Sequence, residues 1–241
     1  MKLAQLLFSQ GFGTRRACAA QIEAGAVTID GERIDDPERE VEAVEGRIFS
    51  VHGEPWPYRT RALIALHKPA GTECSQQPRH HPSVYGLLPA PLRRRGVQSV
   101  GRLDADTTGL LLFTDDGALL HRWTSPKRHV ARVYEVGCRH PVDASQVARL
   151  SAGVRLRDDP APVRAAACAA TGPSSLRLTL TEGRYHQVKR MLAAVGNRVE
   201  TLHRSAFGAL ALPADLPPGA WCWLDGPQVV EAPLPLSGRA P

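Results

Sequence analysis

The sequence predicts an α+β protein made of a small N-terminal domain and a larger second domain. Helical and strand patterns follow one another without the regular strand–helix–strand order of a doubly wound sheet, which favours an α+β fold. The stretch 52–61 is rich in Pro and polar residues and is typical of a linker, and the balance of charge changes sign near it. We therefore expect one domain over 1–59, linker included, a second over 60–227, and a flexible tail over 228–241.

The N-terminal domain is predicted to contain two helices and a β-hairpin. Apolar residues recur at helical spacing in LAQLLFSQ, and Thr14 is placed to cap a second helix that Gly25 ends. In AVTIDGERI, alternating residues flank Asp30-Gly31, a pair suited to the positive φ angles of a tight hairpin turn.

The second domain is predicted to be rich in strands. Strand patterns occur in RALIALHKPAG, LLLF, RVYEVGC, SSLRLTLTEG and RVETLHRSAFGALAL. The stretch YHQVKRMLAAVGN has helical spacing and ends at Gly196-Asn197.

The charge of the chain points to a polyanionic partner. The net charge is +6; residues 1–59 hold 7 Lys and Arg against 10 Asp and Glu, whereas 60–241 hold 23 against 14. A basic domain suits RNA because neutralised phosphates release counterions, although an Arg-rich composition from a GC-rich genome would give the same totals. Candidate phosphate contacts are Arg15, Arg16, Arg93, Arg94, Arg95, Lys127 and Arg128. The first two fall at a helix start, where cations are unfavourable without a nearby anion; for every one, ordinary solvated charge is the alternative.

Several kinds of site are not expected. The five cysteines lack C-x-x-C spacing and the nine histidines lack ligand spacing, so we expect no disulfide framework, no metal and a reducing cytoplasm. No apolar run approaches the ~20 residues of a membrane helix, and the first residues lack the apolar core of a signal peptide. Neither a P-loop nor G-x-G-x-x-G occurs, so no cofactor is expected.

Four aspartates surround the apolar run in GRLDADTTGLLLFTDDG. A strand over 110–113 would separate the two pairs by more than ~10 Å at ~3.3 Å per residue, which argues against a shared Mg²⁺ site and a carboxylate–metal nuclease. Asp115-Asp116 precede a glycine and suit a turn, and Asp106 suits a cap or a loop hydrogen bond. Asp104 follows Arg102 at the mouth of the strand, where a carboxylate can be held ionised beside a substrate.

The same stretch resembles the signature of the pseudouridine synthases of the RsuA/RluB/RluE/RluF group. LHKPAGTECS is similar to their first motif and EGRYHQVKRMLAAVGNRVETLHR to their third. The N-terminal domain resembles an S4-type RNA-binding domain, and the match covers most of residues 1–225. The resemblance implies a catalytic domain with a central, mostly antiparallel sheet and an active-site cleft across it. It also implies cofactor-free isomerisation of a uridine in ribosomal RNA, which the enzyme flips out of the RNA structure.

The resemblance implies roles for individual residues. Asp104 becomes the catalytic carboxylate, acting on C1′, on the base, or as a proton acceptor, and each route needs its ionised form. Lys189 becomes the cation that favours this form, in a position where many relatives have Arg. Tyr134 is expected to stack on the target base and is a candidate acceptor of its C5 proton. The implied substrate-binding residues are Arg102, Lys68, Arg132, Arg184, His186 and Arg190.

Details of the motifs favour one subgroup. Tyr185-His186 resembles the enzymes of the small-subunit 16S rRNA, since the large-subunit enzymes more often have Asn in this motif. His67 stands where Asn is usual, and Arg132 where Lys is usual.

Two alternatives to a 16S rRNA synthase stay open at this point. One is a synthase acting on 23S rRNA, and the other is a non-catalytic RNA-binding factor of ribosome assembly. The presence of Asp104, Tyr134 and Lys189 disfavours the second. We expect a cytoplasmic monomer that binds ribosomal RNA, as 16S rRNA or as a small-subunit assembly intermediate. Residues 1–59 are expected to supply affinity rather than chemistry.

Overall fold

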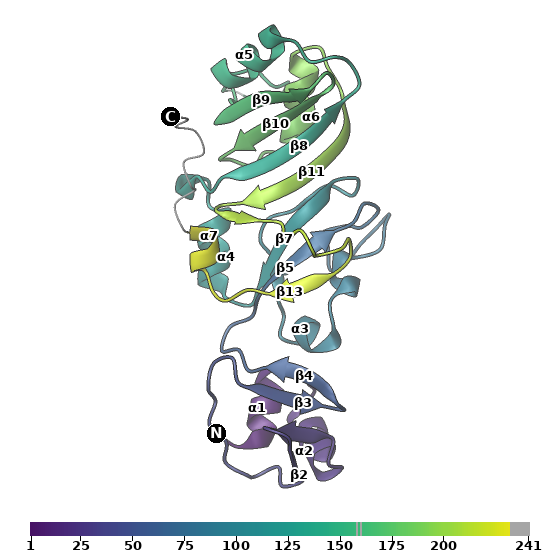
Figure 1. The fold of residues 1–241 in the computed structure, drawn as a ribbon, viewed down its shortest axis with the longest axis vertical. Helices are drawn as coiled ribbons and strands as arrows, with labels where there is room; N and C mark the ends of the chain where they lie inside the picture. The colour runs from purple at the N-terminus through teal and green to yellow at the C-terminus, as the bar shows by residue number, and fades with distance from the viewer. Residues whose placement is uncertain (158, 160, 232–241) are drawn as a thin grey trace. The chain divides into compact units, whose positions relative to one another are not determined.

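A computed structural model describes residues 1–157, 159 and 161–231 of the chain (Figure 1). The chain forms two compact units. The first contains residues 1–62, 88–98 and 114–116, and the second contains the other described residues. No helix in the described part of the chain is both long and apolar enough to cross a membrane.

The first unit has the predicted helices and hairpin. Helices α1 (Leu3–Ser9) and α2 (Arg15–Glu23) accompany a four-stranded antiparallel sheet in the order β2 (Glu32–Ile34), β1 (Val27–Ile29), β3 (Ile48–Val51) and β4 (Glu54–Pro57). Thr14 caps α2, accepting the Ala17 N–H at 3.2 Å. Asp30 and Gly31 have φ angles of 51° and 82°, as the hairpin requires.

The predicted linker at 52–61 is wrong in its middle. His52 and Gly53 form a positive-φ turn, and the next four residues pair with β3 as strand β4. Trp56 of this strand is buried, which explains its place in the sheet. The prolines on either side of Trp56 are tolerated because β4 lies at the sheet edge, where a missing N–H breaks no internal ladder.

Residues 88–98, expected in the second domain, belong to the first unit. Helix α3 (Ala90–Arg94) leads to Arg95, whose side chain is only 4% exposed. Its guanidinium donates to Gln10 Oε1 at 2.8 Å and to the Arg59 carbonyl at 2.9 Å, and forms an ion pair with Asp115 at 2.7 Å. The expectation that Arg95 binds RNA is therefore wrong, because its donors are used within the protein. Asp115 serves structure, as its turn position predicts.

The second unit is built on a large mixed sheet (Figure 1). Its strand order is β13 (Trp221–Trp223), β5 (Leu63–Lys68), β7 (Thr108–Thr114), β11 (Val199–Phe207), β8 (Arg132–Cys138), β10 (Ser175–Leu180) and β9 (Ala167–Gly172), with β12 (Leu210–Ala211) beside β11 and β6 (Gln98–Ser99) beside β7. The pairs β5–β13, β8–β10, β8–β11, β9–β10 and β11–β12 are antiparallel, whereas β7 and β11 run parallel. The helical segments are η1 (Val84–Leu87), α4 (Gly117–Thr124), η2 (Pro126–Arg128), α5 (Ala144–Ala152), α6 (Gln187–Ala194) and α7 (Gln228–Glu231).

The core of the second unit extends to the end of the described chain. Leu110, Leu112 and Phe207 of the sheet pack with Trp123 of α4 and Val230 of α7. The Trp123 indole N–H donates to Glu231 at 2.9 Å, and α4 and α7 lie side by side (Figure 1). The predicted flexible tail is therefore wrong for 228–231, because Val230 is buried; residues 232–241 lie outside the described residues.

One glycine allows the parallel contact between β7 and β11. Gly109 pairs with Arg204 and has a φ of 110°. A Cβ at this position would lie 2.3 Å from the Arg204 carbonyl oxygen, far inside van der Waals contact. The close approach places the residues just before β7 beside those of β11, which matters for the site described below.

Replacing Gly109 with Ala is expected to lower the free energy of unfolding by about 2–4 kcal/mol, from the strained φ and the backbone overlap. Urea unfolding of the variant measures this. Gly86→Ala is the matched control, since a Cβ there meets open space, and it should leave stability unchanged. Equal stability of the two variants would show that β7 and β11 can separate without cost.

Candidate active site

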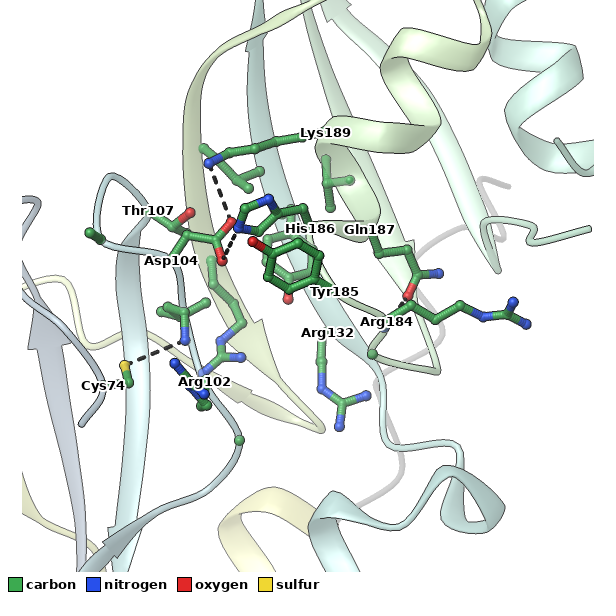
Figure 2. Close-up of a pocket in the computed structure, with 18 of the residues that line it drawn as sticks. Cys74, Arg102, Asp104, Thr107, Arg132, Arg184, Tyr185, His186, Gln187 and Lys189 are labelled. Atoms are coloured by element: carbon green, nitrogen blue, oxygen red, sulfur yellow. Dashed lines mark hydrogen bonds and ion pairs between the residues drawn. The ribbon is translucent and has the colours of Figure 1, made fainter. Parts of the chain in front are cut away.

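A cavity of about 780 Å³ opens on the second unit (Figure 2). Its wall comes from the segment before β7, strands β8 and β11, the start of α6 and the segment 73–81. Cations outnumber carboxylates among its lining residues. The six cations are Arg79, Arg102, Arg132, Arg184, Lys189 and Arg204. The three carboxylates are Glu73, Asp104 and Glu182, and the three imidazoles are His80, His81 and His186. The excess of cations suits an anionic ligand.

Asp104 lies in this wall with its carboxylate between the Lys189 ammonium and the His186 imidazole. Lys189 Nζ is 3.3 Å from one carboxylate oxygen, and His186 Nε2 is 3.4 Å from the other (Figure 2). About a third of the Asp104 side chain is exposed. Of the four aspartates in the central motif, Asp104 is the one among the residues lining the cavity.

Lys68 binds the loop that carries Asp104 through hydrogen bonds to its backbone. This lysine is 0% exposed and donates to the carbonyls of Pro69, Ala105 and Thr107 at 3.0, 3.3 and 2.9 Å. Burial lowers the pKa of its ammonium, partly opposed by nearby acidic groups. The expectation that Lys68 binds substrate is therefore wrong: all three donors face backbone carbonyls, and the residue positions the loop.

Lys189 also binds a second carboxylate. Its Nζ lies 2.7 and 2.8 Å from the two oxygens of Asp106, closer than to Asp104. Burial alone would lower the pKa of Lys189, but Asp106 and Asp104 together raise it. Burial alone would raise the pKa of Asp106, but Lys189 lowers it. Asp106 is thus a partner of the site lysine, and Lys189 stays charged at neutral pH.

Helix α6 brings Lys189 and His186 to the same place. His186 is the N-terminal flanking residue of α6 and has left-handed φ and ψ of 48° and 36°. The Gln187 side chain accepts the Arg184 N–H at 2.8 Å and fixes the turn before the helix. Tyr185, 77% exposed, stacks on the His186 ring with centroids 3.8 Å apart. The turn therefore presents an imidazole to Asp104 and an aromatic ring to solvent.

Strands β8 and β11 supply the remaining wall. Tyr134 is nearly buried, lines the cavity and pairs with Arg204 in the sheet. Arg132, two residues earlier, lies over the Phe207 ring, and burial lowers the pKa of its guanidinium. Tyr134, Arg132, Arg102 and Arg184 therefore lie where the sequence placed them, at the cavity.

Arg190, also expected to bind substrate, directs its guanidinium to backbone carbonyls. It is absent from the cavity wall and donates instead to the carbonyls of Tyr185 and Arg157. Its helical neighbour Lys189 faces Asp104, so the adjacent position on α6 points elsewhere. Arg190 and Arg184 both approach Asp159, which links α6 to that segment.

The remaining basic candidates are exposed but lie outside the cavity. They are Arg15, Arg16, Arg93, Arg94, Lys127 and Arg128. Arg15 lies over the Phe8 ring, 5.3 Å from its centroid, and Arg94 donates weakly to the Phe12 carbonyl at 3.5 Å.

Sequence reasoning missed two buried residues of the wall. Arg204 is 1% exposed; its Nε donates to the Leu110 carbonyl at 2.8 Å, while Nη2 has no partner within the described chain. Thr107 Oγ1 is likewise buried without a partner among the described residues. Nothing in a strand pattern distinguishes such an arginine from a surface one. Across the described ranges, no three His, Cys, Asp or Glu side chains group as metal ligands would.

The positioning role of Lys68 can be tested by Lys68→Met. We expect the free energy of unfolding to fall by about 2 kcal/mol because three carbonyls lose their donor. The amides of Gly71 and Thr107, which donate to Ala105 and Asp104, should exchange with solvent faster. Exposed Lys127→Met is the control. Unchanged exchange at both amides would contradict the role.

Comparison with known proteins agrees with this geometry. Residues 62–194 match the RNA pseudouridylate synthase family and residues 1–46 match the S4 domain. The ribosomal small subunit pseudouridine synthase A of Yersinia pestis is 39% identical over 228 residues, 92% of this chain and 93% of that protein. An uncharacterized RNA pseudouridine synthase of Bacillus subtilis is 37% identical, over 92% and 93% of the two chains. A crystal structure of a pseudouridylate synthase superposes with a TM-score of 0.65 at 34% identity, covering 93% of this chain and 96% of the other. The chain therefore belongs to the RNA pseudouridylate synthase family and begins with an S4 domain.

Proposed function

We propose that this protein converts one uridine of 16S rRNA to pseudouridine, with Asp104 as the catalytic carboxylate. The observation that carries the proposal is the pairing of Asp104 with Lys189 and His186 in a cation-rich cavity. The substrate assignment is supported by the small-subunit relatives, which match over about nine-tenths of the chain. We further propose that the protein acts in the cytoplasm and as a monomer.

The reaction is an isomerisation that needs only positioned side chains. The C1′–N1 glycosidic bond of uridine breaks, the base turns, and a C1′–C5 bond forms. C5 loses its hydrogen as a proton and N1 gains one, so the exchange is redox-neutral and balanced.

Asp104 is the group we assign to this bond rearrangement. An ionised carboxylate is required, whether it reacts with C1′, reacts with the base, or takes a proton. Lys189 Nζ lies 3.3 Å from this carboxylate, and the lysine itself is held by Asp106. His186 lies on the opposite oxygen, within reach of a proton moved at the carboxylate.

Tyr134 and the arginines are proposed to hold the flipped nucleotide. The Tyr134 ring forms part of the cavity wall and offers a flat surface on which uracil can stack. Arg102 is exposed at the same wall and suits a phosphate oxygen. Arg204 carries a buried charge without an ion pair among the described residues, which favours a substrate oxygen nearby.

The S4 domain is proposed to add affinity for rRNA. Arg15 and Arg16 begin helix α2 and are exposed there. Cations at a helix N-terminus are unfavourable by themselves and become favourable against phosphate.

The catalytic assignment is tested by tritium release from 16S rRNA labelled at uridine C5, with EDTA present. Wild type should release tritium, and Asp104→Asn should reduce the rate by about 10³-fold or more. Asp106→Asn is the matched control from the same loop. It should retain activity within about tenfold, since Lys189 keeps Asp104 as a partner.

Each other outcome has a definite meaning. Release from 23S but not 16S rRNA would transfer the substrate assignment to the large subunit. No release from either free RNA, by wild type that still binds RNA, would direct the assay to small-subunit assembly intermediates. No release from those as well would show a non-catalytic binding factor. Full activity of Asp104→Asn would remove Asp104 from the chemistry.

The S4 assignment is tested by Arg15→Ala with Arg16→Ala. We expect the Kd for 16S rRNA to rise about tenfold and the slope of log K against log salt to fall by about 1–2. Turnover at saturating RNA should be unchanged. Arg139→Ala, an exposed arginine of the second unit outside the cavity, is the control. Lost turnover with unchanged Kd would contradict an affinity role.

A further inference from the structure

The segment 76–82 is an exposed loop at the wall of the cavity, and neither the motifs nor the proposed reaction explains it. Its sequence is QQPRHHP, and every one of these residues is exposed. Arg79, His80 and His81 are among the residues that line the cavity. The loop contains no apolar side chain besides its two prolines, so packing alone gives it no reason to be ordered.

Glu73 nevertheless holds the loop in one conformation. Its carboxylate accepts the consecutive backbone N–H groups of Arg79, His80 and His81 at 3.1, 2.8 and 2.9 Å. These bonds lower the pKa of the Glu73 carboxyl, so it is ionised at neutral pH. Hydrogen bonds to a charged acceptor are stronger than neutral ones.

Hydrogen bonds also join the two ends of the loop. The Glu73 N–H donates to the Pro82 carbonyl at 2.9 Å, and the Val84 N–H donates to the Glu73 carbonyl at 2.9 Å. The Ser83 hydroxyl donates to the Ser75 carbonyl. An exposed polar loop thus has both its base and its tip fixed by hydrogen bonds.

The residue after Glu73 is hydrogen-bonded to the loop that carries Asp104. Cys74, the residue after Glu73, accepts the Leu103 N–H at 3.4 Å, and Leu103 precedes Asp104 (Figure 2). The loop 76–82 therefore has a fixed position relative to the catalytic carboxylate. Its exposed side chains are one guanidinium, two imidazoles and two amides, a set that suits phosphates and unstacked bases.

We propose that loop 76–82 is an RNA-binding element that grips the nucleotides flanking the target uridine, and that Glu73 is its positioning residue. The inference rests on the proposed function, since it takes the RNA presented to Asp104 as the ligand. Arg79 would contact the phosphate backbone, and the two imidazoles would lie against flanking bases. Glu73 touches no RNA and acts by aiming this set of side chains.

The charge of Glu73 makes the proposal sharply testable. Glu73→Gln removes a negative charge, so electrostatics alone predicts tighter binding to RNA. The positioning role predicts the reverse, because one oxygen that accepts the loop amides becomes an NH₂ donor facing them. The matched control is Asp215→Asn, which removes one exposed carboxylate outside the cavity.

The measurement is the Kd for 16S rRNA by filter binding over a range of salt, with turnover at saturating RNA measured in parallel. We expect Glu73→Gln to raise the Kd about tenfold, and Asp215→Asn to leave the Kd equal or slightly lower. Arg79→Ala, which leaves the Glu73 bonds intact, should also raise the Kd and reduce the salt slope by about 0.7–0.9. The double variant Glu73→Gln with Arg79→Ala should be less than additive.

Two results would overturn the proposal: tighter binding by Glu73→Gln, or an unchanged Kd for Arg79→Ala. Thermal melting checks that each variant is folded. If Glu73→Gln does not fold, Arg79→Ala still tests the proposal. The proposed function is judged separately by tritium release from wild type. Absence of tritium release by wild type would contradict the proposed function and would leave these binding measurements interpretable.

Discussion

The site depends on one buried ammonium. Lys68 ends strand β5, and its charge is removed from water and satisfied by three backbone carbonyls, two of them in the loop that carries Asp104. Burying a charge costs several kcal/mol, so the arrangement persists only while all three acceptors stay in place. The loop is consequently fixed to the sheet at the point where the carboxylate must meet Lys189. The proposed catalytic carboxylate is therefore positioned by a residue that does not line the cavity.

Above this support, a single lysine serves two carboxylates. Lys189 lies closer to Asp106 than to Asp104. A lysine can do this because its ammonium is a compact charge on a flexible stem, whereas a guanidinium would commit a planar fork to one partner. Asp106 orients the cation, and the longer contact leaves Asp104 accessible. A similar division of labour separates Arg184 from Arg190: both approach Asp159, but the first also lines the cavity.

Local patterns predicted the two N-terminal helices, the first hairpin, several strands of the large sheet, helix α6 and the centre of the site. Strand β8 covers the predicted RVYEVGC, and the Thr14 cap and the Asp30-Gly31 turn form as expected, since each depends on a few neighbouring residues. The motifs predicted three central site residues, Asp104, Tyr134 and Lys189, and all three line one cavity. The errors share a cause. Whether an arginine or lysine is exposed, as in Arg95, Lys68 and Arg204, depends on tertiary contacts distant in sequence. Likewise, the Pro-rich stretch 54–57 forms a strand because Trp56 is buried, and the local sequence does not indicate that burial.

The Arg95 contacts have a consequence for how the chain folds during synthesis. The first unit is completed by the contacts of Arg95 with Gln10, Arg59 and Asp115, so its last residues are made long after residue 62. At about 5–20 residues per second, the nascent chain waits for several seconds with this unit incomplete. During this interval the Gln10 side chain and the Arg59 carbonyl lack the guanidinium that they bind in the folded unit. The first unit is therefore completed by residues that are synthesised only after part of the second unit.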